Sequence, residues 1–400
     1  MQNSLLIDKD LYYVGGNDRR IPLFESAYPV PRGVSYNSYL LSDEKTVLFD
    51  TVDQSVSQEF FENVESALGG RSLDYLVVHH MEPDHSASFE GIVSRYPNVK
   101  VVVNQKTAVM LKNYFSCDLP ELVTVKDGDS LSFGKHNFRF VFAPMVHWPE
   151  VMMSFDETAG TLFSADAFGT FGALSGSLFA DETSFREEFL DDARRYYFNI
   201  VGKYGVQVQN VLKKAAALPI KKVCPLHGPV WREDFNWYLK KYDTWSKYEP
   251  EEEGVVIFYS SIYGHTGNAA EILGSALAEN GVVKVRTYDT SYTHYSELLS
   301  EAFRYSHAVF ASPTYNNGIF ASMEQFLNEL VSHNYQGRAY SLIENGSWAP
   351  QAAKLMHEKL SPLKGMREIG ESVTVLSSVK EDTKEKLIKL AKEIALDFKN

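Results

Sequence analysis

The densest group of side chains able to do chemistry lies in V-V-H-H-M-E-P-D-H, residues 77–85. An apolar strand ends there, because a proline within the run cannot extend a hydrogen-bonded ladder. Residues two apart in an extended chain project to the same side, so His80, Glu82 and Asp84 point together. His85 can join them if the chain turns. One metal ion would leave some of these groups idle, so the run predicts two adjacent metals.

Three more candidate ligands follow apolar stretches later in the chain. His147 and His227 each come just past an apolar strand, and Asp166 ends another. Each is a weak signal alone, because histidine and aspartate are common at strand ends, but together with the first run they form a strong set. His79 lies outside the spacing of that run, and we expect it to have a structural role.

A second group of candidates is the loop S-S-I-Y-G-H-T-G-N, residues 260–268, between an apolar strand and a helix. Backbone N–H groups and the helix dipole at such a helix start favour a phosphate. The loop lacks the Gly-Lys-Ser/Thr signature of nucleotide-triphosphate loops and also lacks G-x-G-x-x-G. A loop of serine and threonine without lysine suits a single terminal phosphate, such as that of FMN.

Two later loops support the same site. A-S-P-T-Y-N-N-G (311–318) follows the third strand of this region, and E-N-G-S-W-A-P (344–350) follows the fourth. Ligands of doubly wound sheets bind at the carboxyl ends of the strands, near the point where the strand order reverses. The three loops would converge there.

The elements that position these residues fall into two regions, separated by the acidic, Pro/Gly-flanked run 248–254. We therefore expect domains at 1–250 and 254–400. The first region alternates short strands with helical patches: strands at 37–41, 46–49, 75–79, 100–103, 138–142 and 161–164, and helices at 56–68 and 184–216. The second alternates regularly, which predicts a parallel, doubly wound sheet: strands at 255–260, 283–288, 307–311 and 338–343, and helices at 268–280, 295–304, 322–332 and 380–398.

Composition limits the chemistry. The 400 residues carry a net charge of −13, which argues against nucleic-acid binding. The two cysteines, Cys117 and Cys224, are too few for a disulfide framework, a four-cysteine zinc site, an iron–sulfur cluster or a rubredoxin-type centre. Redox chemistry would therefore need a flavin, a nicotinamide or a metal held by nitrogen and oxygen. We see no signal peptide and no membrane span, and we expect a cytoplasmic protein.

The order H-x-E-x-D-H, then His, Asp and His, resembles the metallo-β-lactamase fold, whose zinc hydrolases carry H-x-H-x-D-H. Glu82 in the second position and S-P-T-Y-N-N-G (312–318) are similar to the flavodiiron proteins (A-type flavoproteins), in their minimal two-domain class A form. The resemblance covers essentially the whole chain. It implies an N-terminal metallo-β-lactamase-like αββα domain followed by a flavodoxin-like domain with a doubly wound parallel sheet.

The resemblance also implies the site residues. One iron would bind His80, Glu82 and His147, the other Asp84, His85 and His227, with Asp166 bridging. Replacing an imidazole by the Glu82 carboxylate favours iron over zinc. The FMN phosphate would lie against the first loop, formed by Ser260, Ser261, Ile262, Tyr263, Gly264, His265 and Thr266. The isoalloxazine would be flanked by Pro313, Thr314, Tyr315, Asn316, Asn317 and Gly318, and by Gly346, Ser347 and Trp348. Trp148 and Tyr197 are candidates for a catalytic role beside the metals.

The implied activity is reduction of dioxygen to water, of nitric oxide to nitrous oxide, or of both. Dioxygen needs four electrons, of which two ferrous ions supply two and a reduced flavin two. The family implies a head-to-tail homodimer or a dimer of dimers. Because the chain has no cysteine pairs to hold a rubredoxin iron, we expect a separate electron donor, rubredoxin or a similar small redox protein.

Two other functions are compatible with parts of this pattern. One is a zinc hydrolase with a regulatory flavodoxin-like domain, against which Glu82 and the FMN loops argue. The other is an electron-transfer or sensing module with a structural metal, although seven ionisable ligands suit a structural site poorly.

Overall fold

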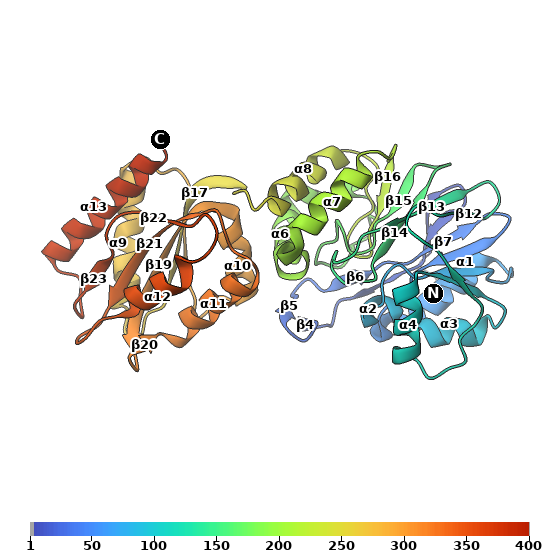
Figure 1. The fold of residues 1–400 in the computed structure, drawn as a ribbon, viewed down its shortest axis with the longest axis horizontal. Helices are drawn as coiled ribbons and strands as arrows, with labels where there is room; N and C mark the ends of the chain where they lie inside the picture. Colours follow the sequence, from blue (N-terminus) through green and yellow to red (C-terminus); the bar gives the residue numbers. More distant parts are fainter. Residues whose placement is uncertain (1–3, 400) are drawn as a thin grey trace. The chain divides into compact units, whose positions relative to one another are not determined.

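The computed structural model describes residues 4–399. The chain divides between Asp243 and Thr244 into two compact units, here called the N-terminal unit and the C-terminal unit (Figure 1). The run 248–254 lies after α8 (Phe235–Ser246) and overlaps the start of β17 (Glu252–Tyr259). Each unit has its own hydrophobic core.

The N-terminal unit contains two large sheets. The first has the order β1 (Leu5–Asp8), β2 (Leu11–Tyr13), β7 (Tyr39–Ser42), β8 (Thr46–Phe49), β9 (Tyr75–Val77), β10 (Lys100–Val103) and β11 (Leu122–Thr124). The second has the order β12 (Ser130–Ser132), β13 (Asn137–Phe142), β14 (Met152–Asp156), β15 (Thr161–Phe163) and β16 (Lys222–Cys224). Two short hairpin-like pairs are β3 (Gly16–Asp18) with β6 (Val34–Tyr36) and β4 (Leu23–Phe24) with β5 (Tyr28–Pro29).

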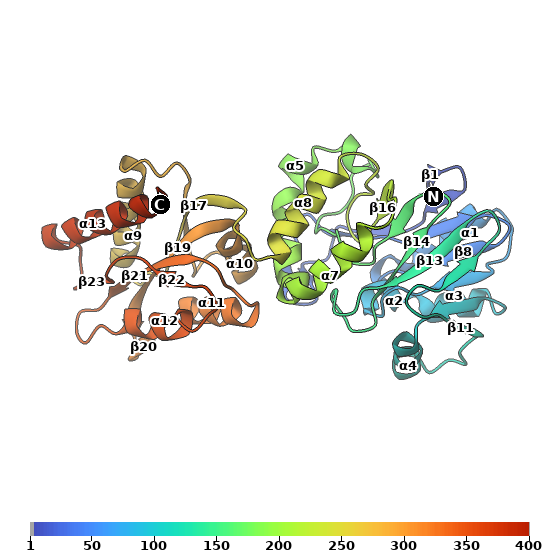
Figure 2. The same ribbon diagram turned by 45° about the horizontal axis from the view of Figure 1, so that its top comes forward.

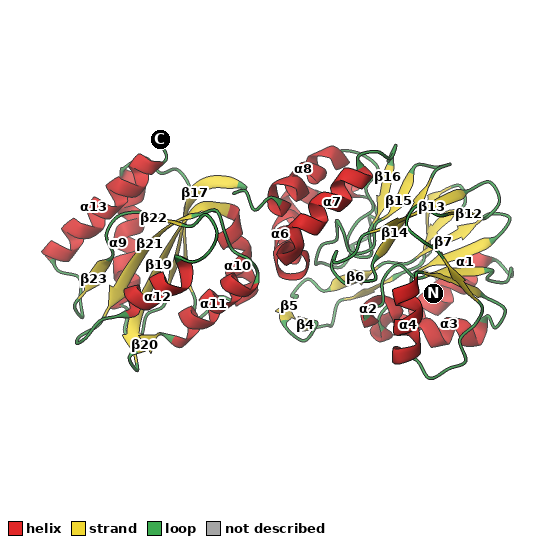
Figure 3. Cartoon of the chain, viewed as in Figure 1, coloured by secondary structure: helices red, strands yellow, loops and turns green. Residues whose placement is uncertain are grey.

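The core of this unit lies between the two sheets. Phe49 from the first sheet stacks on Phe163 from the second, with ring centroids 4.1 Å apart. The helices are η1 (Gln54–Val56), α1 (Ser57–Leu68), α2 (Pro83–Ser86), α3 (Phe89–Arg95), α4 (Gln105–Tyr114), η2 (Ala180–Glu182), α5 (Phe185–Glu188), α6 (Leu190–Tyr196), η3 (Tyr197–Val201), η4 (Gly202–Tyr204), α7 (Gly205–Ala215) and α8. Helices flank both sheets (Figure 3), so the unit has the expected αββα layers.

The helical stretch expected over 184–216 is not continuous. It is broken into α5, α6, the π-helical turn η3, the 3₁₀ turn η4 and α7. Gly202 follows the π-helical turn, where a Cβ atom would lie 3.1 Å from Cδ1 of Phe198. A glycine with this close contact suits a change of helical geometry rather than a regular helix interior.

The C-terminal unit is a single sheet covered on both faces. Its strands run in the order β18 (Val285–Asp289), β17, β19 (Tyr305–Tyr315), β21 (Ala339–Asn345) and β22 (Arg367–Glu368), while β20 (Gly318–Ile319) pairs with β19 and β23 (Val373–Val375) with β21. All pairs are parallel except β19–β20. The order 2-1-3-4-5 of the main parallel strands is that of flavodoxin-like sheets.

The helices of this unit are α9 (His265–Glu279), α10 (Tyr295–Arg304), α11 (Ala321–Ser332), α12 (Ala352–Leu360) and α13 (Glu381–Asp397). α9 and α13 lie side by side on one face (Figure 2) and share a core with the strands. The four predicted strands and four predicted helices are confirmed to within a few residues. The prediction omitted α12 and the short strands β20, β22 and β23.

A buried cation ties the start of the C-terminal unit to its sheet. Arg338 is 1% exposed and donates to the carbonyl oxygens of Tyr248 (2.6 Å), Phe303 (2.5 Å) and Tyr305 (2.8 Å). Burial lowers the pKa of Arg338 to about 10. Among residues 4–399, no helix is long and apolar enough to cross a membrane.

Candidate metal centre and cofactor site

The predicted metal ligands come from both sheets of the N-terminal unit. His80 and Glu82 follow β9, and Asp84 and His85 lie on α2. The other three follow strands β13, β15 and β16: His147, Asp166 and His227. All seven side chains are buried.

Asp50 and His79 hold the loop that carries the first ligands. Asp50 Oδ1 accepts hydrogen bonds from the backbone N–H groups of His79 (2.7 Å) and His80 (3.3 Å). The His79 ring contacts Asp50 through Nδ1 (2.5 Å) and Ser154 Oγ through Nε2 (2.8 Å). His79 therefore has structural contacts on both ring nitrogens, and its ring does not join the ligand groups.

The seven predicted ligands form two adjacent groups. Ligand atoms of His80, Glu82, His147 and Asp166 all lie within 4.8 Å of one another, and the same holds for Asp84, His85 and His227. Asp166 lies between the groups. Its Oδ2 is 3.1 Å from His147 Nε2 and 3.5 Å from His80 Nε2, while its Oδ1 is 3.1 Å from His85 Nε2. Each carboxylate oxygen thus faces a different group.

The donor atoms fit two cations. His85 Nε2 and His227 Nε2 face each other at 3.0 Å, an arrangement that two neutral imidazoles with a bound metal would satisfy. Both carboxylate oxygens of Asp84 and Oδ1 of Asp166 are buried and accept no well-aligned hydrogen bond among the described residues, although Asp84 Oδ2 lies 3.2 Å from Nε2 of both His85 and His227. Buried polar atoms normally have partners. Imidazole and carboxylate donors suit iron.

The charges in this site strongly perturb one another. Burial lowers the pKa of His147, but Asp166 and Glu82 outweigh it and raise that pKa to about 9. Burial also lowers the pKa of His85, but Asp84 and Asp166 outweigh it and raise that pKa to about 10. A histidine must be neutral to bind a metal, so loading the site releases protons.

The two candidates beside the metal ligands have different surroundings. The half-buried Trp148 ring meets the His80 ring edge-on at 5.3 Å. Tyr197 packs against Phe198 and Tyr242, with centroids 5.1 and 4.9 Å away. Of the two adjacent tyrosines, Tyr196 is the one whose ring lies beside a predicted ligand, with its centroid 5.5 Å from that of His227.

Sequence reasoning missed Tyr196 and Glu25. The Tyr196 hydroxyl is buried without a hydrogen-bond partner among the described residues, and burial, with Asp166 and Asp84 nearby, raises its pKa. The sequence offers no signal that separates two adjacent tyrosines at the end of α6. Glu25, between β4 and β5, is exposed, and desolvation together with the neighbouring Glu82 raises its pKa.

The C-terminal unit has a cavity of about 500 Å³ at the carboxyl ends of its strands. Most of the predicted cofactor residues line it: Ser261, Ile262, Tyr263, His265, Thr266, Pro313, Thr314, Tyr315, Asn316, Gly346, Ser347 and Trp348. Asn345 and Ser377 also line it and were not predicted. Ser260, Gly264, Asn317 and Gly318 do not; Ser260 is fully buried and donates to Ser312 Oγ (3.3 Å).

This cavity fits FMN in two respects. The Ser261 hydroxyl is buried without a partner among the described residues. α9 begins beside it without a side-chain cap, after Gly264 at φ +89°, so its first N–H groups are open to a phosphate. Tyr263 and Trp348 are 87% and 81% exposed, as expected for aromatic rings that would cover a flat ring system.

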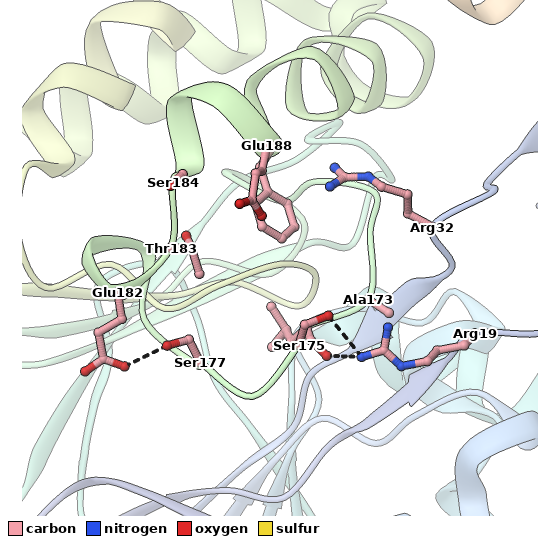
Figure 4. A pocket seen from close by; sticks show the side chains of 11 residues that line it. Arg19, Arg32, Ala173, Ser175, Ser177, Glu182, Thr183, Ser184 and Glu188 are labelled. Atoms are coloured by element: carbon pink, nitrogen blue, oxygen red, sulfur yellow. Dashed lines mark hydrogen bonds between the residues drawn. The ribbon is translucent and has the colours of Figure 1, made fainter.

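Another hollow, also of about 500 Å³, lies in the N-terminal unit and is lined by none of the predicted residues (Figure 4). Its charged groups are largely paired. Arg32 bonds Asp192 through Nε (2.9 Å), and Glu182 accepts from Ser177 (3.0 Å). Arg19 donates to Ser175 Oγ (3.4 Å).

Comparisons with known proteins agree with this geometry. Residues 34–228 match the model of the ODP family beta lactamase, and residues 257–393 match flavodoxin. A nitric oxide reductase of Moorella thermoacetica is 29% identical over 367 residues, covering 91% of each chain.

Two solved structures are similar over nearly their whole length. The rubredoxin oxygen:oxidoreductase of Desulfovibrio gigas has a TM-score of 0.92 and 28% identity, with 99% of each chain covered. A variant of the flavo di-iron protein of Thermotoga maritima has a TM-score of 0.88 and 26% identity, covering 99% of this chain and 98% of that one. With its lactamase-like unit, its two ligand groups and its flavodoxin-like unit, this chain belongs to the flavodiiron proteins.

Proposed function

We propose that this protein reduces dioxygen to water, nitric oxide to nitrous oxide, or both, at a diiron site supplied with electrons by FMN. The observation that carries the proposal is the position of Asp166, whose two oxygens face two buried ligand groups, one of which contains Glu82. Two metals about 3.5–4 Å apart can bind one small molecule between them. The names of the Moorella and Desulfovibrio relatives support the same two substrates.

In this proposal His80, Glu82 and His147 would hold one iron, Asp84, His85 and His227 would hold the other, and Asp166, which contacts both groups, would be shared between them. When bound, the iron pair and the flavin together supply the four electrons that dioxygen requires. The protein provides a closed, dry setting, because every ligand is buried. Tyr196, with its buried hydroxyl near Asp166 and Asp84, donates a hydrogen bond to the substrate. Trp148 packs against His80 and limits its movement.

The C-terminal unit binds the FMN. The open N-terminus of α9 and the Ser261 hydroxyl would hold the phosphate, and the exposed rings of Tyr263 and Trp348 would flank the isoalloxazine. Ser260, which donates to Ser312 Oγ (3.3 Å), would help to shape the phosphate loop.

We also propose a rubredoxin-like electron donor, which the name of the Desulfovibrio relative supports. A head-to-tail homodimer, or a dimer of such dimers, would bring the flavin of one chain to the irons of its partner. The two free cysteines, Cys117 and Cys224, support a cytoplasmic location, because disulfides are rare in reducing compartments.

A zinc hydrolase is the competing function. It is disfavoured by the Glu82 carboxylate within the first ligand group and by the flavin-type cavity of the second unit. Metal analysis separates the two functions: protein produced with ample iron should contain two irons per chain, and two zinc ions with no iron would support the hydrolase.

Anaerobic stopped-flow spectroscopy tests the proposal directly. The iron-loaded, FMN-containing protein is fully reduced and mixed with dioxygen and, separately, with nitric oxide, while flavin and iron absorbance are followed. Rapid reoxidation by at least one gas, with water or nitrous oxide as product, is expected. If a sample with two irons and one FMN per chain consumed neither gas, the proposed function would be wrong.

A further inference from the structure

Glu150 is a buried carboxylate that belongs to neither ligand group. It lies between β13 and β14 and is 1% exposed. Its Oε1 accepts a hydrogen bond from Nδ1 of His80 (2.8 Å) and another from the backbone N–H of Met81 (2.9 Å). The opposite ring nitrogen of His80, Nε2, is the one that faces Glu82 (3.2 Å) and Asp166 (3.5 Å).

We propose that Glu150 is a positioning residue that makes the two metal positions unequal. By accepting from Nδ1–H, it fixes the His80 tautomer in which Nε2 carries the lone pair toward the metal. It also places a negative charge behind that imidazole, which makes His80 a stronger donor. This inference rests on the metal assignment of the proposed function.

The two histidines of the second ligand group show the contrast. His227 Nδ1 donates to a neutral acceptor, the carbonyl oxygen of Ser35 (2.8 Å). His85 Nδ1 is buried and has no hydrogen-bond partner within residues 4–399. His80, His227 and His85 are therefore supported by a carboxylate, by a carbonyl and by no acceptor, in that order.

The difference in charge has a consequence for the metals. The group around His80 contains Glu82 and is backed by Glu150, whereas the group around His227 contains Asp84 alone, apart from the shared Asp166. Added negative charge stabilises the more highly charged cation. We therefore expect the cation at the His80 position to be bound more tightly and to remain ferric at lower potential than its neighbour.

A purely structural role for Glu150 is the alternative, because it also holds the loop. Its side-chain Oε1 accepts from the Met81 N–H (2.9 Å), and its backbone carbonyl accepts from Asn104 Nδ2 (2.5 Å). The variant Glu150→Gln keeps the shape and can still accept through its amide oxygen, but it removes the charge. The variant Asn104→Ala removes this loop contact together with the N-cap of α4, where Asn104 Oδ1 accepts from the N–H groups of Lys106 (2.9 Å) and Thr107 (3.0 Å). It keeps the Glu150 charge and therefore controls for a loss of local structure.

The experiment uses the full, FMN-containing chain after its metals have been stripped by a chelator. Zn(II), and Fe(II) under argon, are titrated in competition with a chromogenic chelator to give both site affinities. We expect Glu150→Gln to weaken one of the two sites by about 10–100-fold and to leave the other within threefold. Asn104→Ala should leave both sites within threefold. In iron-loaded protein, Mössbauer spectra during reductive titration should show the two one-electron steps moving closer together only in Glu150→Gln.

Two results would overturn the inference. One is unchanged affinity at both sites in folded Glu150→Gln, and the other is an equal loss in Glu150→Gln and Asn104→Ala. If Glu150→Gln does not fold, Glu150→Asp decides, because aspartate keeps the negative charge. A loss of about 10–100-fold in the affinity of one site of folded Glu150→Asp would count against a charge effect. If the unmodified protein binds two metals but reduces neither gas, the proposed function fails while these affinities still test Glu150.

Discussion

Replacing Asp166 by asparagine is the most direct test of the shared ligand. Asp166 is 1% exposed, and its oxygens lie 3.1 Å from both His147 Nε2 and His85 Nε2. The amide is nearly the same size as the carboxylate, so packing is preserved. It is neutral, however, and offers one oxygen donor instead of two. One metal position would lose its oxygen ligand from residue 166, and both positions would lose the negative charge of the Asp166 carboxylate.

The size of the effect follows from the geometry. Two unit charges 4 Å apart interact by about 4 kcal/mol at an effective dielectric constant of 20. Easier burial of the neutral amide offsets part of that loss. If about 2.7 kcal/mol of the lost attraction remains after this offset, metal binding weakens about a hundredfold. We therefore expect Asp166→Asn to retain less than one iron per chain after dialysis and to lose gas reduction, with one FMN still bound because the cofactor cavity lies in the other unit.

The assay combines iron analysis, flavin absorbance and gas consumption on the same sample. Asp181→Asn is the control, because Asp181 is a surface aspartate bonded to Arg232 (2.9 Å) and should retain both metals. Full oxidase or reductase activity in Asp166→Asn, with two irons per chain, would refute the bridging role.

Three further changes have definite expected outcomes. Glu82→His recreates the H-x-H-x-D-H order and should shift metal selectivity roughly tenfold toward zinc; metal analysis after loading with equal iron and zinc checks this, and an unchanged ratio would contradict it. Trp348→Ala should weaken FMN binding about three- to tenfold, the value of one aromatic ring contact, in a fluorescence titration of flavin-free protein; equal affinity would show that the exposed ring does not meet the flavin. Hydrogen bonding to Asp156, joined by Asp10 and opposed by burial, raises the pKa of His136 to about 9. Its stabilisation, about 1–2 kcal/mol after allowance for solvent screening, is therefore complete below about pH 6.5 and is lost as pH rises through 9. Urea unfolding at pH 6 and at pH 10 measures the free energy of unfolding. Its decrease between the two pH values should be larger in the unmodified protein than in His136→Gln, and equal decreases would exclude this contribution.

The candidate metal ligands could be predicted from local patterns, and their division between two metals from the resemblance to flavodiiron proteins. Strand ends meet in a layered α/β domain, so H-x-E-x-D-H and the later His147, Asp166 and His227 converge without knowledge of the rotamers. The same reasoning located the C-terminal cavity, because the loops after parallel strands meet at one sheet edge.

What could not be predicted depends on contacts between distant residues or on helical phase. Glu150 meets His80 across 70 positions, and His227 meets the Ser35 carbonyl across 192. The choice between Tyr196 and Tyr197 depends on the π-helical turn η3, which breaks a stretch that we expected to be one helix. Asn345 and Ser377 join the cofactor cavity through β21 and the end of β23, and the second of these strands is too short to stand out in the sequence.

The buried Arg338 has a consequence for dissecting the molecule. Because its guanidinium binds the Tyr248 carbonyl, the chain just ahead of β17 is part of the folded C-terminal unit rather than a free tether. A protease should therefore cut poorly at Tyr248, although the surrounding segment is acidic and polar. A fragment intended to carry FMN on its own should begin ahead of Tyr248; one beginning at Gly254 would leave a buried cation short of one acceptor and should express as a less stable domain.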